Sequence, residues 1–141
     1  MKIQIPSHIL EKIQSHGESA YPYEGAGLML GHEEKGARKV ETVLFLENAR
    51  EETHQHNRYL ITAEDMLWGE KEAARLSSSI LGIFHSHPDH PSQPSEYDRE
   101  FALPWYSYLI TSVINGSAER SQSWRLEDDR ARFSEEIIKV F

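Results

Sequence analysis

The sequence predicts an α/β fold of the α+β kind, in which helices flank a mixed β-sheet. Short apolar or alternating runs are typical of strands, and the strongest of them covers Tyr106 to Ile114. Apolar residues at helical spacing after Ser7 and Thr62 predict two helices among these runs. A chain of 141 residues can bury one core without disulfides, and it has no cysteine to form them. We therefore expect one domain spanning residues 1–141.

The first third of the chain is expected to contain three strands and one helix. Ser7 is a candidate N-cap for the helix, whose apolar stripe continues up to Gly17. A turn-rich segment, Tyr21 to Gly25, then leads into a strand of small residues. The expected strands are Lys2 to Ile5 at a sheet edge, Ala26 to Leu30 and Lys39 to Leu46, and a hairpin loop at His32 to Ala37 joins the last two.

The middle of the chain predicts a loop, a brief strand and a helix. The polar segment Glu47 to Asn57 predicts the loop, and Arg58 to Ile61 the strand. Thr62 and Asp65 have the spacing of a capping box, so we expect a helix from there to about Ser78. The residues expected on its inner face are Met66, Leu67, Ala73 and Ala74.

The last third is expected to be mostly sheet. Asn115-Gly116 is a sharp turn signal between the strand at Tyr106 to Ile114 and a hairpin partner at Ser121 to Leu126. Asp128 to Arg132 predicts a turn or a single helical coil. Phe133 to Phe141 is either a strand or a helix, because its periodicity does not decide between them.

The segment Leu81 to Asp98 contains the residues best suited to chemistry. A buried strand is expected to run through His85-Ser86-His87 and to stop at Pro88. Side chains alternate between the faces of a strand, so the two histidines share one face, with their Cα atoms about 6–7 Å apart. Ser95 opens an expected helix, whose first turn carries Asp98 back toward the end of the strand.

Two neutral imidazoles and one carboxylate are a typical ligand set of catalytic zinc, which keeps its fourth position open for water. Because the chain lacks cysteine, only histidines and carboxylates are available to hold such a metal. A single His-x-His is weak evidence, and an acidic residue in the first helical turn has an ordinary electrostatic role. Taken together, however, His85, His87 and Asp98 predict one bound Zn²⁺ per chain.

A family resemblance covers nearly the whole chain. His85-x-His87, seven residues, Ser95, two residues and Asp98 match the H-x-H-x7-S-x2-D signature, and the chain resembles the JAMM (MPN+) zinc metallopeptidases, above all their compact prokaryotic members. Tyr23 to Gly31 resembles the upstream strand of that family, although Ala26 stands where many members have cysteine. The resemblance implies an MPN/JAB-type mixed sheet flanked by helices, with a layering like that of cytidine deaminases.

The resemblance also implies roles for five side chains. His85, His87 and Asp98 would hold zinc, which lowers the pKa of a bound water toward about 7. Glu24 would accept the proton of that water and return it to the leaving amine, although most glutamates in turns are simply solvated. Ser95 would donate a hydrogen bond to the developing oxyanion, and it is also a candidate helix cap.

The family implies hydrolysis of a peptide or isopeptide bond after the C-terminal Gly-Gly of a ubiquitin-like or sulfur-carrier protein. One alternative is a catalytically inactive MPN-type assembly scaffold, which needs neither zinc nor Glu24. Another is a two-metal hydrolase of the metallo-β-lactamase type, because residues 85–90 also fit its H-x-H-x-D-H motif. That site needs further histidines, and none follows His90.

Composition narrows the expected partners and location. The formal net charge is −8 with acidic residues spread along the chain, which argues against a nucleic-acid partner. No apolar run is long enough for a signal peptide or a membrane span, so we expect a soluble cytoplasmic protein. A homodimer is compatible with this composition. His54 and His56 form a second His-x-His, for which a solvated loop is the expected setting.

Overall fold

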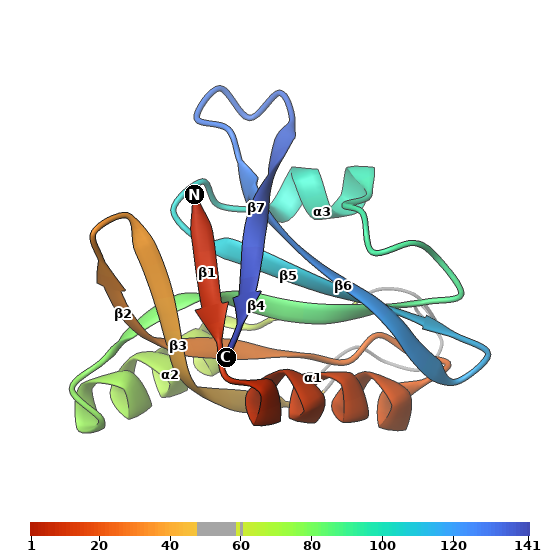
Figure 1. Ribbon diagram of the computed structural model, residues 1–141, viewed down its shortest axis with the longest axis horizontal. Coiled ribbons are helices and arrows are strands. Elements are labelled where there is room, and N and C mark those ends of the chain that lie inside the picture. Colours follow the sequence, from red (N-terminus) through yellow and green to blue (C-terminus); the bar gives the residue numbers. More distant parts are fainter. Residues whose placement is uncertain (48–58, 60) are drawn as a thin grey trace.

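The computed structural model describes residues 1–47, 59 and 61–141 and shows helices packed on a mixed sheet (Figure 1). The sheet closes on itself in the strand order β1-β3-β2-β4-β5-β6-β7. Its strands are β1 (Lys2–Ile5), β2 (Ala26–Glu34), β3 (Ala37–Leu46), β4 (Ser79–Pro88), β5 (Ser107–Ile114), β6 (Ser117–Leu126) and β7 (Phe133–Val140). The helices are α1 (Ser7–Ala20), α2 (Ala63–Arg75) and α3 (Glu96–Phe101).

β1 closes the barrel, because it pairs in parallel with β3 on one side and with β7 on the other. β4 and β5 are also parallel, and the other neighbouring strands are antiparallel. The expected mixed sheet with flanking helices is confirmed, whereas the prediction that Lys2 to Ile5 form an edge strand is wrong. Four alternating residues carry no signal of how many neighbours a strand has, and one neighbour lies at the far end of the sequence.

The core lies on both faces of the central strands. Met29 of β2 belongs to a buried cluster that includes Ile9 and Ile13 of α1. Leu28 points to the opposite face, into a second cluster that includes Ala73 of α2. The two helices therefore cover opposite faces of β2, which explains why this strand begins as an uninterrupted apolar run.

Two glycines that suggest chain breaks lie inside regular elements. Gly17 is within α1, which continues to Ala20, and Gly31 is within β2. A Cβ on Gly17 would lie 3.1 Å from the Cβ of Ser86, and one on Gly31 would lie 1.9 Å from the Lys39 carbonyl oxygen. Close packing therefore explains both glycines, and the predicted ends at these positions are wrong.

The two long helices, α1 and α2, have different N-caps. Pro6 occupies the N-cap position of α1, so the prediction that Ser7 is the cap is wrong. In α2 the predicted capping box is confirmed, because Thr62 Oγ1 accepts from the Asp65 N–H at 3.0 Å and the Asp65 carboxylate accepts from the Thr62 N–H at 2.9 Å. α2 ends at Arg75, three residues before the expected end.

The inner face of α2 is only partly as expected. Ala73 is buried and Met66 packs against the second core cluster, as predicted. Leu67 is 56% exposed and Ala74 is also exposed, so their predicted positions are wrong. The helix instead turns Gly69 toward the sheet, where a Cβ would lie 2.3 Å from Leu28 Cδ1, and the absence of a side chain lets the helix approach β2 closely.

The C-terminal part forms the expected hairpin. Asn115 and Gly116 both have positive φ, 51° and 84°, as a two-residue type I′ turn between β5 and β6 requires. Residues 133–140 form a strand, because they pair with β6 and β1. The brief strand expected at 58–61 lies partly outside the described residues, and Tyr59 and Ile61 are not in a strand.

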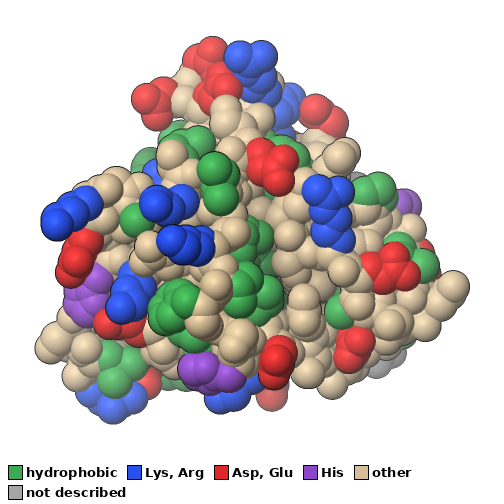
Figure 2. Space-filling view, viewed as in Figure 1, with side chains coloured by type: hydrophobic (Ala, Val, Ile, Leu, Met, Phe, Trp, Pro, Cys, Tyr) green, Lys and Arg blue, Asp and Glu red, His purple; other side chains and the backbone are tan. Residues whose placement is uncertain are grey.

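The surface carries both signs of charge. On the face drawn in Figure 2, Asp and Glu side chains lie among the Lys and Arg side chains, with small hydrophobic areas between them. Among the described residues, none of the helices has the length and apolar character that crossing a membrane requires.

Candidate metal centre

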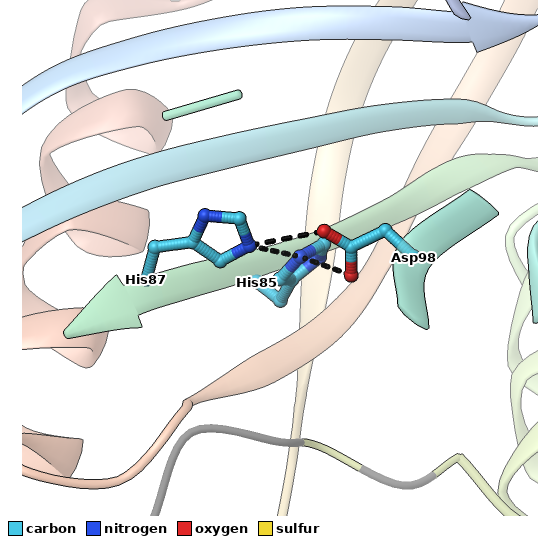
Figure 3. Close-up of side chains that lie close together, drawn as sticks. All are labelled: His85, His87 and Asp98. Atoms are coloured by element: carbon cyan, nitrogen blue, oxygen red, sulfur yellow. Dashed lines mark hydrogen bonds and ion pairs between the residues drawn. The ribbon is translucent and has the colours of Figure 1, made fainter. Parts of the chain in front are cut away.

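The end of β4 presents two histidines on one face of the sheet (Figure 3). His85 and His87 alternate with Ser86, and all three residues are buried. The Nε2 atoms of the two imidazoles lie 3.2 Å apart. The strand therefore does what its residue pattern predicts: it brings two imidazoles together.

A capping box places the carboxylate that faces these imidazoles. Ser95 caps α3, with its Oγ accepting from the Asp98 N–H at 3.1 Å, and its own N–H donates to Asp98 Oδ2 at 2.8 Å. The cap thereby holds the Asp98 carboxylate at the start of the helix. Asp98 Oδ1 lies 3.2 Å from His85 Nε2, and Oδ2 lies 3.1 Å from His87 Nε2.

The three side chains fit a tetrahedral zinc ion. Two atoms that are each bonded to such an ion at 2.0–2.1 Å are about 3.3 Å apart. The two Nε2 atoms lie 3.2 Å apart, and each lies at a similar distance from one Asp98 oxygen: His85 Nε2 is 3.2 Å from Oδ1 and His87 Nε2 is 3.1 Å from Oδ2. His85, His87 and Asp98 are thus brought together as predicted, and they form the one such ligand group found among the described residues.

The proton positions of His87 also suit metal binding. Its Nδ1 lies 2.8 Å from the carbonyl oxygen of Pro91. A carbonyl only accepts, so Nδ1 carries the proton and the Nε2 lone pair faces Asp98 and His85. His85 Nδ1 is buried without a hydrogen-bond partner among the described residues, and its ring stacks on Tyr59 with centroids 4.4 Å apart.

The electrostatics favour neutral imidazole beside an ionised carboxylate. Burial lowers the pKa of His85 below its ordinary value, although Asp98 opposes the shift. Burial alone would raise the pKa of Asp98, but its contacts with His85, His87 and the Ser95 N–H hold this pKa well below its usual range. The carboxylate therefore supplies a full negative charge to a cation at neutral pH.

Glu24 reaches the same face of the sheet through the pairing of β2 with β4. Ala26 is opposite His85, and Glu24 lies two residues before Ala26, just ahead of the strand. Glu24 and His87 line one cleft, so both face the same space. Gly25 between them is fixed to Ser86, whose Oγ accepts from the Gly25 N–H at 2.9 Å and whose N–H donates to the Gly25 carbonyl at 3.0 Å. Glu24 is 5% exposed, so this carboxylate is not a solvated turn residue.

An open cleft of about 460 Å³ joins the predicted catalytic residues. Its lining includes Glu24, His87 and Ser95. Ser95 can serve both as cap and as donor, because its oxygen accepts from Asp98 while its hydroxyl proton is not used in that bond. The cleft therefore places a carboxylate, a hydroxyl and one candidate ligand, His87, around one space.

The described residues do not assemble the rival two-metal arrangement. Asp89, its central residue, accepts from the Tyr21 hydroxyl at 2.7 Å and from the Asn115 N–H at 2.9 Å. Its neighbour His90 is exposed at the edge of the cleft. His54 and His56 lie outside the described residues.

Sequence reasoning missed two partners of the candidate metal ligands. The Pro91 carbonyl is a backbone group, so no residue type in the sequence indicates that it takes part. The stacking of Tyr59 on His85 brings together residues from separate elements, and no short motif marks it.

Two curated proteins are similar to this chain in sequence. The chain is 33% identical over 108 residues to a probable TtuB-protein conjugate cleaving protease from Thermus thermophilus, covering 77% of this chain and 68% of that protein. It is 28% identical over 103 residues to the Lys-63-specific deubiquitinase BRCC36 from Camponotus floridanus, covering 69% of this chain but only 40% of that protein.

A solved structure has the same fold as this chain. AF2198, a JAB1/MPN domain protein from Archaeoglobus fulgidus, superposes with a TM-score of 0.59 at 17% identity, over 99% of each chain. This likeness concerns the fold. The family model described as prokaryotic homologs of the JAB domain matches residues 6–127 and thus contains all five predicted site residues. The chain therefore belongs to the JAB (JAMM/MPN) family, among its prokaryotic members.

Proposed function

We propose that this protein is a zinc-dependent peptidase or isopeptidase that cleaves after the C-terminal Gly-Gly of a ubiquitin-like or sulfur-carrier protein. The observation that carries the proposal is that two imidazole nitrogens 3.2 Å apart each lie within 3.2 Å of an Asp98 carboxylate oxygen, beside a cleft lined by His87 and a buried glutamate. A solvated or purely structural cluster does not need that spacing. An assembly scaffold needs neither the ligand set nor Glu24.

In the proposed reaction the metal and this chain's own residues have separate roles. Zinc held by His85, His87 and Asp98 would act as a Lewis acid and would lower the pKa of the attacking water. Glu24 lies beside this space and takes the proton of the attacking water, then returns it to the leaving amine. The Ser95 hydroxyl donates to the oxygen that becomes negative as the carbonyl is attacked.

The names of the relatives support the substrate class. One relative is named for cleaving TtuB conjugates and the other for removing ubiquitin, so a small protein modifier is the substrate that we infer for this chain. A tail ending in two glycines suits the site, because residues without side chains let the peptide backbone approach the buried ligand atoms closely.

The proposal is tested with zinc-loaded protein and two matched sets of substrates. Each set carries a ubiquitin-like protein joined after Gly-Gly either to a peptide or to a lysine side chain, and the control set replaces Gly-Gly with Ala-Ala. Mass spectrometry is expected to show cleavage directly after Gly-Gly and little cleavage after Ala-Ala. A preparation that binds zinc stoichiometrically yet cleaves none of these substrates would refute the proposed substrate class, and one that binds no zinc would favour the scaffold.

Ser95→Ala is expected to lower kcat by about 10²–10³-fold, as removal of an oxyanion donor does in other hydrolases. Zinc stoichiometry should be unchanged, because Ser95 contacts the Asp98 carboxylate through its backbone N–H. Thr62→Ala is the matched control, since it removes the corresponding hydroxyl from the capping box of α2. Both variants should lose about 1 kcal/mol of stability. A kcat for Ser95→Ala within twofold of the native value would exclude the catalytic role.

A further inference from the structure

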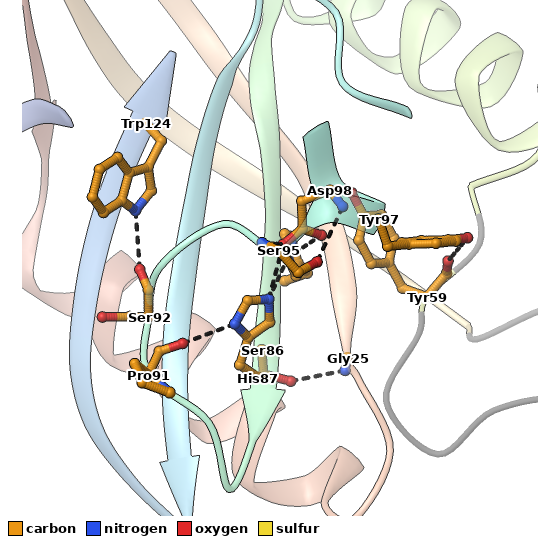
Figure 4. A network of polar contacts seen from close by, with 11 residues as sticks. Gly25, Tyr59, Ser86, His87, Pro91, Ser92, Ser95, Tyr97, Asp98 and Trp124 are labelled. Carbon is orange, nitrogen blue, oxygen red and sulfur yellow. Dashed lines mark hydrogen bonds and ion pairs between the residues drawn. The ribbon is translucent and has the colours of Figure 1, made fainter. Parts of the chain in front are cut away.

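The loop between β4 and α3 is held through three successive carbonyl groups, and Figure 4 shows the contacts of two of them, Pro91 and Ser92. The His90 carbonyl accepts from Ser112 Oγ of β5 at 2.7 Å. The Pro91 carbonyl accepts from His87 Nδ1 of β4 at 2.8 Å. The Ser92 carbonyl accepts from the Trp124 indole N–H of β6 at 2.9 Å. Each of three neighbouring strands, β4, β5 and β6, thus donates a hydrogen bond to one of three consecutive residues of this loop.

Ser92 is held on a second side as well. Its hydroxyl donates to Gln122 Oε1 at 2.7 Å, and Gln122 Nε2 donates in turn to Glu135 Oε2 at 3.0 Å. The contact with Glu135 fixes which end of the Gln122 amide faces Ser92. Ser92 is only 2% exposed, so water does not compete readily for these bonds. β6 therefore holds both the backbone and the side chain of Ser92.

The contacts of Ser92 affect His87 through the neighbouring peptide group. The Pro91 carbonyl and the Ser92 nitrogen belong to the same planar group, which is joined to the Cα of Ser92 by a single rotatable bond, so fixing the carbonyl and the side chain of Ser92 restricts how this group can turn. This carbonyl is the acceptor that keeps the proton of His87 on Nδ1. A peptide group free to rotate would let the imidazole turn or exchange tautomers, and Nε2 would no longer face Asp98.

We infer that Trp124, together with Gln122, is a positioning residue that fixes the tautomer and the ring orientation of His87. Neither side chain is among the three ligands, and both act through Ser92 and the Pro91 carbonyl. The inference rests on the proposed function only in taking His87 as a zinc ligand. Its effect on the tautomer exists in the metal-free protein, where it can be measured separately.

The test compares Trp124→Phe with Trp105→Phe in the full chain. Trp124→Phe removes the N–H donor but keeps an aromatic ring, whereas Trp105 is 61% exposed and serves as the control. Long-range ¹H–¹⁵N spectra of the metal-free proteins report which nitrogen of His87 carries the proton. Zinc affinity is measured by competition with a chelator, and thermal unfolding shows whether each variant is folded.

Native protein and Trp105→Phe are expected to show one His87 tautomer, protonated at Nδ1. Trp124→Phe should show a mixture of tautomers and roughly 10-fold weaker zinc binding, the low end of what losing an outer hydrogen-bond partner costs. A folded Trp124→Phe with the native tautomer and native zinc affinity would overturn the inference. If this variant fails to fold, Ser92→Ala removes the Gln122 contact alone, and the same two measurements decide. If native protein binds no zinc, the proposed function fails, while the tautomer of His87 still tests the inference.

Discussion

Asp98→Asn is expected to abolish zinc binding and turnover together. The substitution keeps the shape of the side chain but removes the negative charge that faces His85 and His87. The neutral amide is a poor zinc ligand, and when its oxygen accepts from Ser95 its NH₂ group would face the Nε2 of His85. The loss of affinity should exceed the roughly 10–100-fold that removal of an outer partner costs. Metal analysis, chelator competition and the cleavage assay measure it.

Asp65→Asn is the matched control for that experiment. Asp65 occupies the same place in the capping box of α2 as Asp98 does in α3, and it makes the same two contacts. Both variants should therefore weaken a cap, but only Asp98→Asn should lose metal. Zinc at 100 times its Kd should stabilise the native protein and Asp65→Asn by about 2.7 kcal/mol, and Asp98→Asn not at all. Stoichiometric zinc in Asp98→Asn would contradict the assigned ligand set.

Glu24→Gln is expected to lower kcat by about 10²–10⁴-fold while zinc remains bound. Glutamine has nearly the same shape, so the buried site should keep its packing, but a neutral amide cannot accept a proton from water. The three ligand atoms belong to other residues, so zinc affinity should change little. Single-turnover kinetics on the Gly-Gly substrate, beside metal analysis of the same sample, separates these two effects.

Glu96→Gln provides the comparison for this variant. Glu96 lines the same cleft but is exposed and pairs with Arg99 at 2.8 Å, so its amide should leave kcat near the native value. A native kcat in Glu24→Gln would remove the proposed base. An equal loss in both variants would show instead that the cleft responds to its total charge.

Local signals predicted the parts of the fold that depend on neighbouring residues. Thr62 with Asp65, and Asn115 with Gly116, each satisfy their own backbone groups within a few residues, so their structures follow from the sequence pattern. The position of β1 between β3 and β7 depends instead on residues more than a hundred positions away. The glycine at position 17 depends on how closely a helix approaches the sheet, and hydropathy does not record that distance.

In the candidate site too, local patterns predicted some residues and not others. His85, His87 and Asp98 lie within one strand, one loop and one helical turn, so strand alternation and a helix cap suffice to bring them together. Glu24 required the family resemblance, because its position depends on the register between β2 and β4, where the bonded residues Gly25 and Ser86 are 61 apart. The Pro91 carbonyl and Trp124 carried no signal, since backbone groups and an indole are found in many settings.

The closed order of the strands has a consequence for contacts with other chains. Each strand has a neighbour on both sides, but at two places the pairing is partial. β1 pairs with residues 37–39 of β3, and β7 pairs with residues 123–126 of β6, so among the described residues the rest of these two long strands has a strand partner on one side only. Unpaired N–H and C=O groups of this kind can pair with a strand of another chain. A second copy of this protein that extended the sheet would therefore have to join it at one of these two segments.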